Sequence, residues 1–194
     1  QTYTIKVVGK TEEVVYRPVD YETQISYIEE RGVYLLKRGS ELQFKALTVD
    51  ENGQELLADD VQWVLDDYSA QYLNVASDGT VSVKLSAPNM MCNVSLFGMA
   101  DGVAGEVIHI VLAKEISTVS DFEAIRDNYY GYYVLRNDID FNYSSGDLAL
   151  FEPFPVFYGI LDGNGHQLRN IMFDTKSEAT DYGMILHNYG DIRN

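Results

Sequence analysis

An internal repeat at the C-terminal end is the feature that most constrains the fold of this chain. Residues 159–170 read GILDGNGHQLRN and residues 183–194 read GMILHNYGDIRN. A fixed period of 20 to 50 residues is typical of structural units that stack on one another. At an offset of 24 residues, four of the twelve positions are identical: Gly159 with Gly183, Asn164 with Asn188, Arg169 with Arg193, and Asn170 with Asn194.

The repeat predicts a right-handed parallel β-helix. One short coil cannot bury its apolar side alone, so successive coils must stack and pair their strands in parallel. Equivalent residues would then lie above one another, with Asn164 over Asn188 and Asn170 over Asn194 in amide ladders. The sequence Leu-Arg-Asn at 135–137 repeats this ending and predicts an earlier coil, followed by an insertion at about 142–155.

A short helix is predicted at about 120–128, before the first coil. Ser120 followed by Glu123 forms a capping-box pattern, with Val119 as the preceding apolar residue. Phe122 and Ile125 would share one face of this helix. We expect the helix to cover the N-terminal end of the stack, because the ends of a solenoid need a cap.

The preceding sequence predicts short strands joined by tight turns. Residues 2–7 alternate between apolar and polar, and so do residues 42–49, with Leu42, Phe44 and Ala46 on one face. Turn sequences occur at 50–53 and 77–80. Further strands are expected at 61–65, 81–85, 93–99 and 105–112. This spacing is typical of a β-sandwich.

Three regions follow from this pattern. Residues 32–115 would form the sandwich and residues 116–194 the beginning of the β-helix, with a short linker near 114–118. Residues 1–31 are either an edge of the sandwich or the last strands of a preceding module. The overall class is mainly β.

The composition restricts the partners. Hydrophobic residues make up 46% of the chain, enough for a core. The formal charge of −16 argues against nucleic acid and against anionic lipid as partners. No run of 18 apolar residues occurs, so no membrane insertion is expected. The single cysteine, Cys92, lies in an apolar run and is expected to be a small buried side chain.

Residues 32–113 resemble the bacterial immunoglobulin-like domains of the invasin and intimin type. The resemblance rests on Arg38-Gly39-Ser40, the turn that ends at Gly53, the strand with Trp63, and the segment 75–81. The Gly-x-Ala-x-Ile-x-Ala ending of that family is replaced by residues 91–97. The resemblance implies an immunoglobulin-like β-sandwich in an exported protein.

Residues 116–194 resemble the start of the β-helix modules of bacterial surface proteins, with GLUG-like or pectate-lyase-like repeats. The matching segments are YVLRNDID at 133–140, FYGILDGNGHQLRN at 157–170, and residues 183–194, where Leu186 replaces the family's second glycine. In such families these motifs are structural and occur in adhesins and other exported proteins. Some related β-helices are polysaccharide lyases or hydrolases.

Acidic residues of the repeat region are the candidates for a metal or for catalysis. Asp138 and Asp140 flank Ile139 and would point to one face of a strand, where they could bind Ca²⁺ or act as acid and base. Asp162 begins the string 162–166, which reads as a Ca²⁺ loop or simply as a turn. The alternative for Asp138 and Asp140 is a pair of solvated carboxylates on the outside of the strand. We expect no catalytic residue and no cofactor other than Ca²⁺.

An aromatic cluster is the candidate binding site. Tyrosine suits interfaces because its ring is rigid and amphipathic, and sugars stack on aromatic faces. The alternative is that these rings pack the cap helix onto the first coil. The residues predicted to contact a cell-surface glycan or protein are Tyr129, Tyr130, Tyr132, Phe154 and Tyr158.

Two functions are compatible with these features. The first is a non-catalytic stalk or scaffold module of a secreted or cell-surface bacterial protein, with a role in adhesion. The second is the accessory N-terminal part of a β-helix polysaccharide lyase or glycoside hydrolase. The location would be extracellular, with either Gln1 downstream of a removed leader or a shortened sequence that leaves the leader out. Because the repeat stops inside its second copy, we also expect self-association through the open C-terminal end of the stack.

Overall fold

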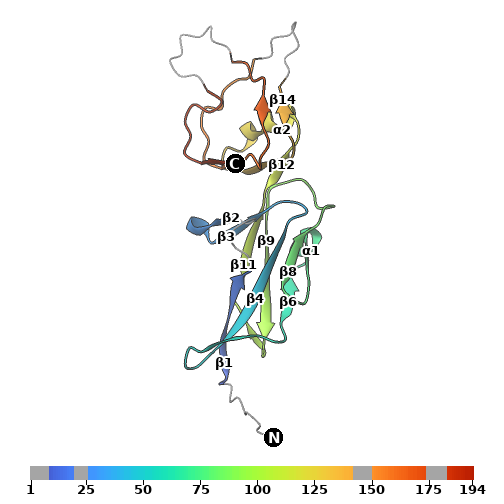
Figure 1. The fold of residues 1–194 in the computed structure, drawn as a ribbon, viewed down its shortest axis with the longest axis vertical. Coiled ribbons are helices and arrows are strands. Elements are labelled where there is room, and N and C mark those ends of the chain that lie inside the picture. The colour runs from blue at the N-terminus through green and yellow to red at the C-terminus, as the bar shows by residue number, and fades with distance from the viewer. Residues whose placement is uncertain (1–8, 20–25, 142–149, 174–182) are drawn as a thin grey trace. The chain divides into compact units, whose positions relative to one another are not determined.

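The computed structural model describes residues 9–19, 26–141, 150–173 and 183–194 (Figure 1). The chain is mainly β and divides into two compact units. Unit 1 comprises residues 1–88 and 92–112, and unit 2 comprises residues 89–91 and 113–194. The division after residue 112 lies three residues before the end of the predicted sandwich. The predicted strand at 2–7 lies outside the described residues.

The first sheet of unit 1 is antiparallel throughout. Its order is β1-β4-β8-β7, and β5 pairs with β4. The strands are β1 (Thr11–Pro18), β4 (Glu41–Asp50), β5 (Glu55–Leu57), β7 (Leu73–Val75) and β8 (Thr80–Val83).

The second sheet of unit 1 has the order β10-β9-β11-β3-β2, and β6 pairs with β9. All neighbours are antiparallel except β11 and β3, which run parallel. The short helices η1 (Glu29–Arg31) and α1 (Ser69–Tyr72) interrupt the strands. The strands are β2 (Ser26–Ile28), β3 (Val33–Leu36), β6 (Gln62–Leu65), β9 (Cys92–Ala100), β10 (Val103–Ala104) and β11 (Ile108–Leu112).

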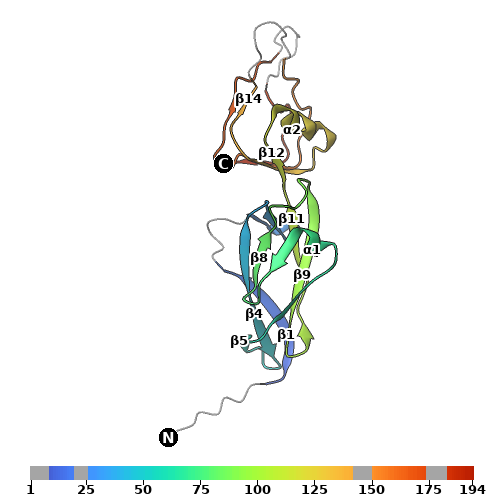
Figure 2. The ribbon, with the colours of Figure 1, turned by 90° about the vertical axis from the view of Figure 1, so that its right-hand side faces the viewer.

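Side chains from both sheets pack against one another in the interior of unit 1. The predicted alternation in β4 is confirmed, since Leu42, Phe44 and Ala46 are all buried. Phe44 contributes to the same cluster as Leu96 of β9 and Ile110 of β11. Figure 2 shows β4 and β8 to one side of this unit and β9 to the other. Because β1 and β2 belong to these sheets, the described part of residues 1–31 is built into unit 1.

Two side chains clarify the packing of unit 1. Cys92 is buried as predicted, and burial raises the pKa of its thiol. The Tyr16 hydroxyl of β1 donates to the Gly98 carbonyl (2.8 Å) and accepts from the Gly98 N–H (2.6 Å), so it joins the first sheet to β9 of the second. The ring also packs against Trp63, with centroids 5.5 Å apart.

Unit 2 is built from turns of chain that stack in parallel. Its main sheet has the order β12-β13-β15-β17, with every neighbouring pair parallel. A second parallel ladder joins β14 to β16. Three further parallel bridges join Phe151 to Phe173, Phe154 to Ile185 and Phe157 to Asn188. The strands are β12 (Lys114–Ile116), β13 (Tyr132–Leu135), β14 (Ile139–Asp140), β15 (Ile160–Asp162), β16 (Leu168–Arg169) and β17 (Asp191–Arg193).

The predicted offset of 24 residues is wrong. Tyr132 pairs with Ile160, an offset of 28, and Ile160 pairs with Asp191, an offset of 31. Asn188 therefore lies opposite Phe157 and not opposite Asn164.

The predicted pairs that depended on that offset change with it. The partner of Gly159 is Gly190 instead of Gly183. The Asn170 side chain donates to Asp140, and the Asn194 side chain donates to Asp162, so the two do not form an amide ladder with each other. Part of the predicted insertion at 142–155 lies outside the described residues.

A column of three glycines explains the observed register. A Cβ atom on Gly159 would lie 2.0 Å from the Gly131 carbonyl oxygen, and one on Gly190 would lie 2.3 Å from the Gly159 oxygen. Only glycine permits so close an approach of neighbouring backbones. Asn188 also helps to place Gly190 in this position, because its Oδ1 accepts the Gly190 N–H (3.1 Å) and forms a tight turn. We call Gly131, Gly159 and Gly190 the glycine column.

The predicted helix exists but begins earlier than expected. It consists of α2 (Val119–Glu123) followed by the 3₁₀ turn η2 (Ala124–Asp127). The N-cap is Thr118, not Ser120, and the reciprocal partner is Asp121, not Glu123. Within the described residues, no helix is long and apolar enough to cross a membrane.

The helix packs on the core of unit 2. Phe122 and Ile125 are both fully buried, which confirms that they share one face. They join Ile116, Phe141, Phe151, Phe154 and Phe157 in a single cluster. Asn89 completes β12, because its side chain donates to the Glu115 carbonyl and accepts the Glu115 N–H, both at 2.8 Å.

We predict that Gly190→Ala destabilises unit 2 by about 2 kcal/mol or more, because the new Cβ collides with backbone that cannot move freely. Gly183→Ala is the matched control, since its Cβ would meet only Ile185 oxygen at 3.5 Å, an ordinary contact. Thermal or urea unfolding of both variants checks this. Equal losses of stability in the two variants would contradict the observed register.

We predict that Tyr16→Phe lowers the free energy of unfolding of unit 1 by about 1–2 kcal/mol, because the Gly98 N–H and carbonyl lose their shared partner. Tyr130→Phe, which removes a hydroxyl from an exposed ring, should cost almost nothing. Urea unfolding followed by fluorescence and circular dichroism measures both. Unchanged stability of the Tyr16 variant would refute the proposed link between the sheets.

Candidate functional site

The five aromatic residues predicted to bind a ligand differ in their accessibility. Phe154 and Tyr132 are buried, at 0% and 4% exposure, so their rings are not available at the surface. Tyr129 is half-buried and packs edge-on against Phe154, with centroids 6.1 Å apart. Tyr130 and Tyr158 remain exposed, at 60% and 39%. The packing alternative therefore holds for part of the cluster and leaves two tyrosines as candidates.

These two tyrosines stack with a third, Tyr189, which the sequence analysis missed. The Tyr130 and Tyr158 rings are 4.7 Å apart and nearly parallel, at an angle of 4°. The Tyr158 and Tyr189 rings are 5.2 Å apart at 14°. Tyr189 is 69% exposed. We call Tyr130, Tyr158 and Tyr189 the tyrosine ladder.

The glycine column positions the ladder. Each of the three tyrosines directly precedes one of the three glycines, so each ring leaves the backbone at the same point of its turn. Backbone hydrogen bonds hold the turns at this level: the Tyr158 N–H donates to the Tyr129 carbonyl (2.9 Å), and the Tyr189 N–H donates to the Phe157 carbonyl (2.8 Å). The ring spacing is thus close to the separation of neighbouring strands.

Two exposed apolar residues, Pro155 and Leu186, each lie three residues before a tyrosine of the ladder. Leu186 is 40% exposed, and its N–H donates to the Phe154 carbonyl, which places it level with exposed Pro155 of the preceding turn.

The sequence signal that could have identified Tyr189 is the dipeptide Tyr-Gly, which occurs at 130–131, 158–159 and 189–190. The same dipeptide at 182–183 begins outside the described residues.

The candidate carboxylate Asp138 is engaged by protein groups. Its Oδ2 lies 2.7 Å from Arg169 Nη2. Its Oδ1 accepts the Gln167 N–H (3.1 Å) and lies 3.4 Å from His166 Nδ1. Ile139 beside it is buried, so Asp138 points outward as expected.

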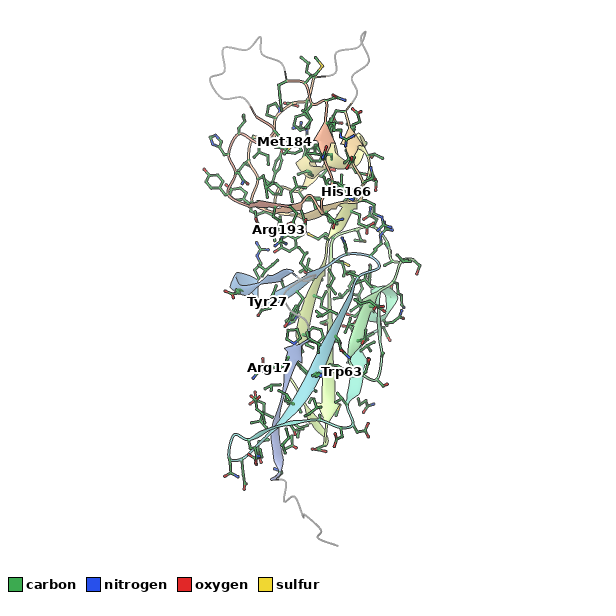
Figure 3. All side chains as sticks on the ribbon, viewed as in Figure 1. Arg17, Tyr27, Trp63, His166, Met184 and Arg193 are labelled. Atoms are coloured by element: carbon green, nitrogen blue, oxygen red, sulfur yellow. The ribbon has the colours of Figure 1, made fainter. Side chains whose placement is uncertain are left out.

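The other two candidate carboxylates also have partners. Asp140 accepts a hydrogen bond from the Asn170 side chain at 2.8 Å. Asp162 accepts the Asn164 N–H (2.8 Å) and the Asn194 amide (3.0 Å), and lies 3.8 Å from Arg193 Nε. In the part of the chain that the structure describes, no group of three or more His, Cys, Asp or Glu side chains is placed to hold a metal ion. Figure 3 shows His166 and Arg193 on unit 2.

The string 162–166 forms a turn. Asn164 and Gly165 both have positive φ, at 50° and 76°, as expected for a tight reversal. The Asn164 side chain donates to the Leu135 carbonyl of the preceding turn (3.1 Å). This asparagine therefore links adjacent turns through the backbone carbonyl of Leu135.

Electrostatics argue against Asp138 as a general acid. The hydrogen bond from the Gln167 N–H, followed by the charges of Arg169 and His166, holds the pKa of this carboxyl below its ordinary value of 3.8. A general acid in glycoside cleavage needs a raised pKa to stay protonated near neutral pH. Asp138 is therefore better suited to pairing β14 with β16.

We predict that Asp138 titrates below pH 3.8 in the folded chain. Because its pKa is lower than in the unfolded chain, its contribution to stability is present above the unfolded value and is lost as the pH falls through the folded value. Arg169→Gln should raise the pKa only partly, since the Gln167 N–H remains. Carboxyl ¹³C NMR titration measures this, and a midpoint above 3.8 would exclude the hydrogen-bonded arrangement.

No protein-family model matches the chain, and no curated protein matches it either.

Proposed function

We propose that this chain is a non-catalytic module of a secreted or cell-surface bacterial protein that binds glycan through the tyrosine ladder. In this proposal unit 1 is an immunoglobulin-like β-sandwich that serves as a stalk. Unit 2 is the beginning of a parallel β-helix that carries the binding surface. The single observation that carries the proposal is the exposed stack of Tyr130, Tyr158 and Tyr189.

The pairing of the strands supports the two architectural assignments. Unit 1 has two mainly antiparallel sheets around a common core, the arrangement expected of a sandwich. Unit 2 has a parallel sheet whose successive strands lie about one turn of chain apart, with an apolar interior. Such an arrangement suits a rigid support, because each turn is held by its neighbours.

The surface of unit 2 supports binding as its role. Large aromatic side chains are usually at least partly covered, and a contiguous exposed group of them marks an interaction site. The ladder rings are already stacked and held by the backbone, so a ligand would not have to order them. The candidate carboxylates, by contrast, are engaged with arginine or asparagine.

The test is an array of neutral and acidic glycans probed with the labelled chain. We predict binding to at least one glycan, and at least a tenfold loss in the double variant Tyr130→Ala/Tyr189→Ala. Tyr68→Ala, which removes an exposed tyrosine from unit 1, is the control and should bind as the natural chain does.

Circular dichroism and thermal unfolding establish that the variants are folded. Absence of any glycan signal, or binding that survives loss of the ladder, would refute the proposed function.

A further inference from the structure

The geometry of the ladder limits how a ligand can contact it. Tyr158 has Tyr130 on one face and Tyr189 on the other, which agrees with its exposure being the lowest of the three. A sugar ring cannot stack on a covered face. What all three residues can offer together is a row of ring edges with their hydroxyl groups. Among the described residues, none is hydrogen-bonded to these hydroxyls.

The spacing of this row favours one kind of polymer. The ring centroids are separated by 4.7 and 5.2 Å, so the rings repeat at about one strand spacing. In an extended peptide, successive side chains on one face are about 6.6–6.8 Å apart, so their spacing does not match that of the tyrosines. The sugar residues of an extended, linear polysaccharide have a length close to this spacing, and each carries hydroxyl groups that exchange hydrogen bonds with phenols.

The size of the exposed surface disfavours a protein partner. A stable protein interface buries about 800 Å² on each side. Three tyrosines of the observed exposure offer about 250–420 Å², even with the whole of each exposed side chain counted. The formal charge of −16 further opposes a second copy of the chain on this surface.

Charge also selects among polysaccharides. The charged residues nearest to the ladder in the sequence are Asp127, three residues before Tyr130, and Asp191, two residues after Tyr189. Asp191 is exposed and lies 3.6 Å from Arg193. No Lys or Arg lies as close in the sequence to any of the three tyrosines, and His187, two residues before Tyr189, counts as neutral in the formal charge at pH 7. These segments therefore carry no fixed positive charge that would compensate a carboxylate or sulfate group on the ligand.

We propose that the ladder recognises a neutral, linear polysaccharide that lies along the stack, with about one sugar residue per tyrosine. This inference rests on the proposed function and adds the ligand class and its orientation. Affinity would come from hydrogen bonds to the three hydroxyls, which contribute additively along the row. Two consequences distinguish this proposal from other modes of glycan binding. The affinity should increase with the length of the oligosaccharide, and polyanionic glycans should not bind.

The experiment is isothermal titration calorimetry with defined oligosaccharides. The probes are β-1,4-linked hexamers and dimers of glucose, mannose and xylose, with the hexamer of galacturonic acid as the anionic comparison. We expect at least one neutral hexamer to bind, its dimer to bind at least tenfold more weakly, and the galacturonate hexamer to give no heat. Tyr158→Phe, which keeps the stack but removes the central hydroxyl, should weaken hexamer binding about three- to tenfold.

The outcomes separate the inference from the proposed function. The inference alone fails if the ladder variants lose array binding but one of three results is found. These results are equal affinity for dimer and hexamer, binding of the galacturonate hexamer at least as strong as that of the neutral hexamers, and an unchanged affinity of the Tyr158→Phe variant for the hexamer. If no neutral hexamer binds while an acidic glycan binds through the ladder, the ligand class is wrong. If no glycan binds through the ladder at all, both proposals fail.

Discussion

The close approach of backbone to backbone at the glycine column is the constraint on which unit 2 depends. A side chain at Gly159 or Gly190 would occupy the space of a carbonyl oxygen in the neighbouring turn. Neighbouring turns can therefore approach this closely only where the chain has a glycine. The positions of the glycines thus determine which residues of successive turns lie side by side. The stacking of Tyr130, Tyr158 and Tyr189 follows directly, since each precedes one of these glycines. A local steric requirement thus determines a surface that spans three turns.

Local patterns predicted much of the fold because their cause is local. The alternation of Leu42, Phe44 and Ala46 fixes a strand with one buried face, whatever its neighbours are. The helix at 119–127 was predicted for the same reason, but its first residue was not. Two overlapping capping patterns occur there, and the structure uses Thr118 because Asp121 Oδ2 accepts the N–H groups of both Ser117 (3.1 Å) and Thr118 (3.0 Å). The sequence contains both options and does not rank them.

The register between turns could not be predicted in this way. Counting identities favoured the offset of 24, but the lengths of successive turns differ, at 28 and 31 residues, so no fixed period aligns them. The tyrosine ladder depends on that register, which is why Tyr189 was missed while buried Tyr132 and Phe154 were included. The outward direction of Asp138 was predictable from Ile139 alone. Its pairing with Arg169 was not, because it requires β14 and β16 to be aligned.

The separation of the aromatic residues between the units has a spectroscopic consequence. Trp63, the only tryptophan of the chain, lies on β6 in unit 1 (Figure 3), so indole emission reports the folding of that unit alone. Closely packed tyrosines occur in both units, as Tyr27 with Tyr34 and Tyr68 with Tyr72 in unit 1 and as the ladder in unit 2, so near-ultraviolet dichroism reports both units together. Comparison of tryptophan emission with this dichroism therefore shows, without any label, whether unit 1 melts together with the rest of the chain.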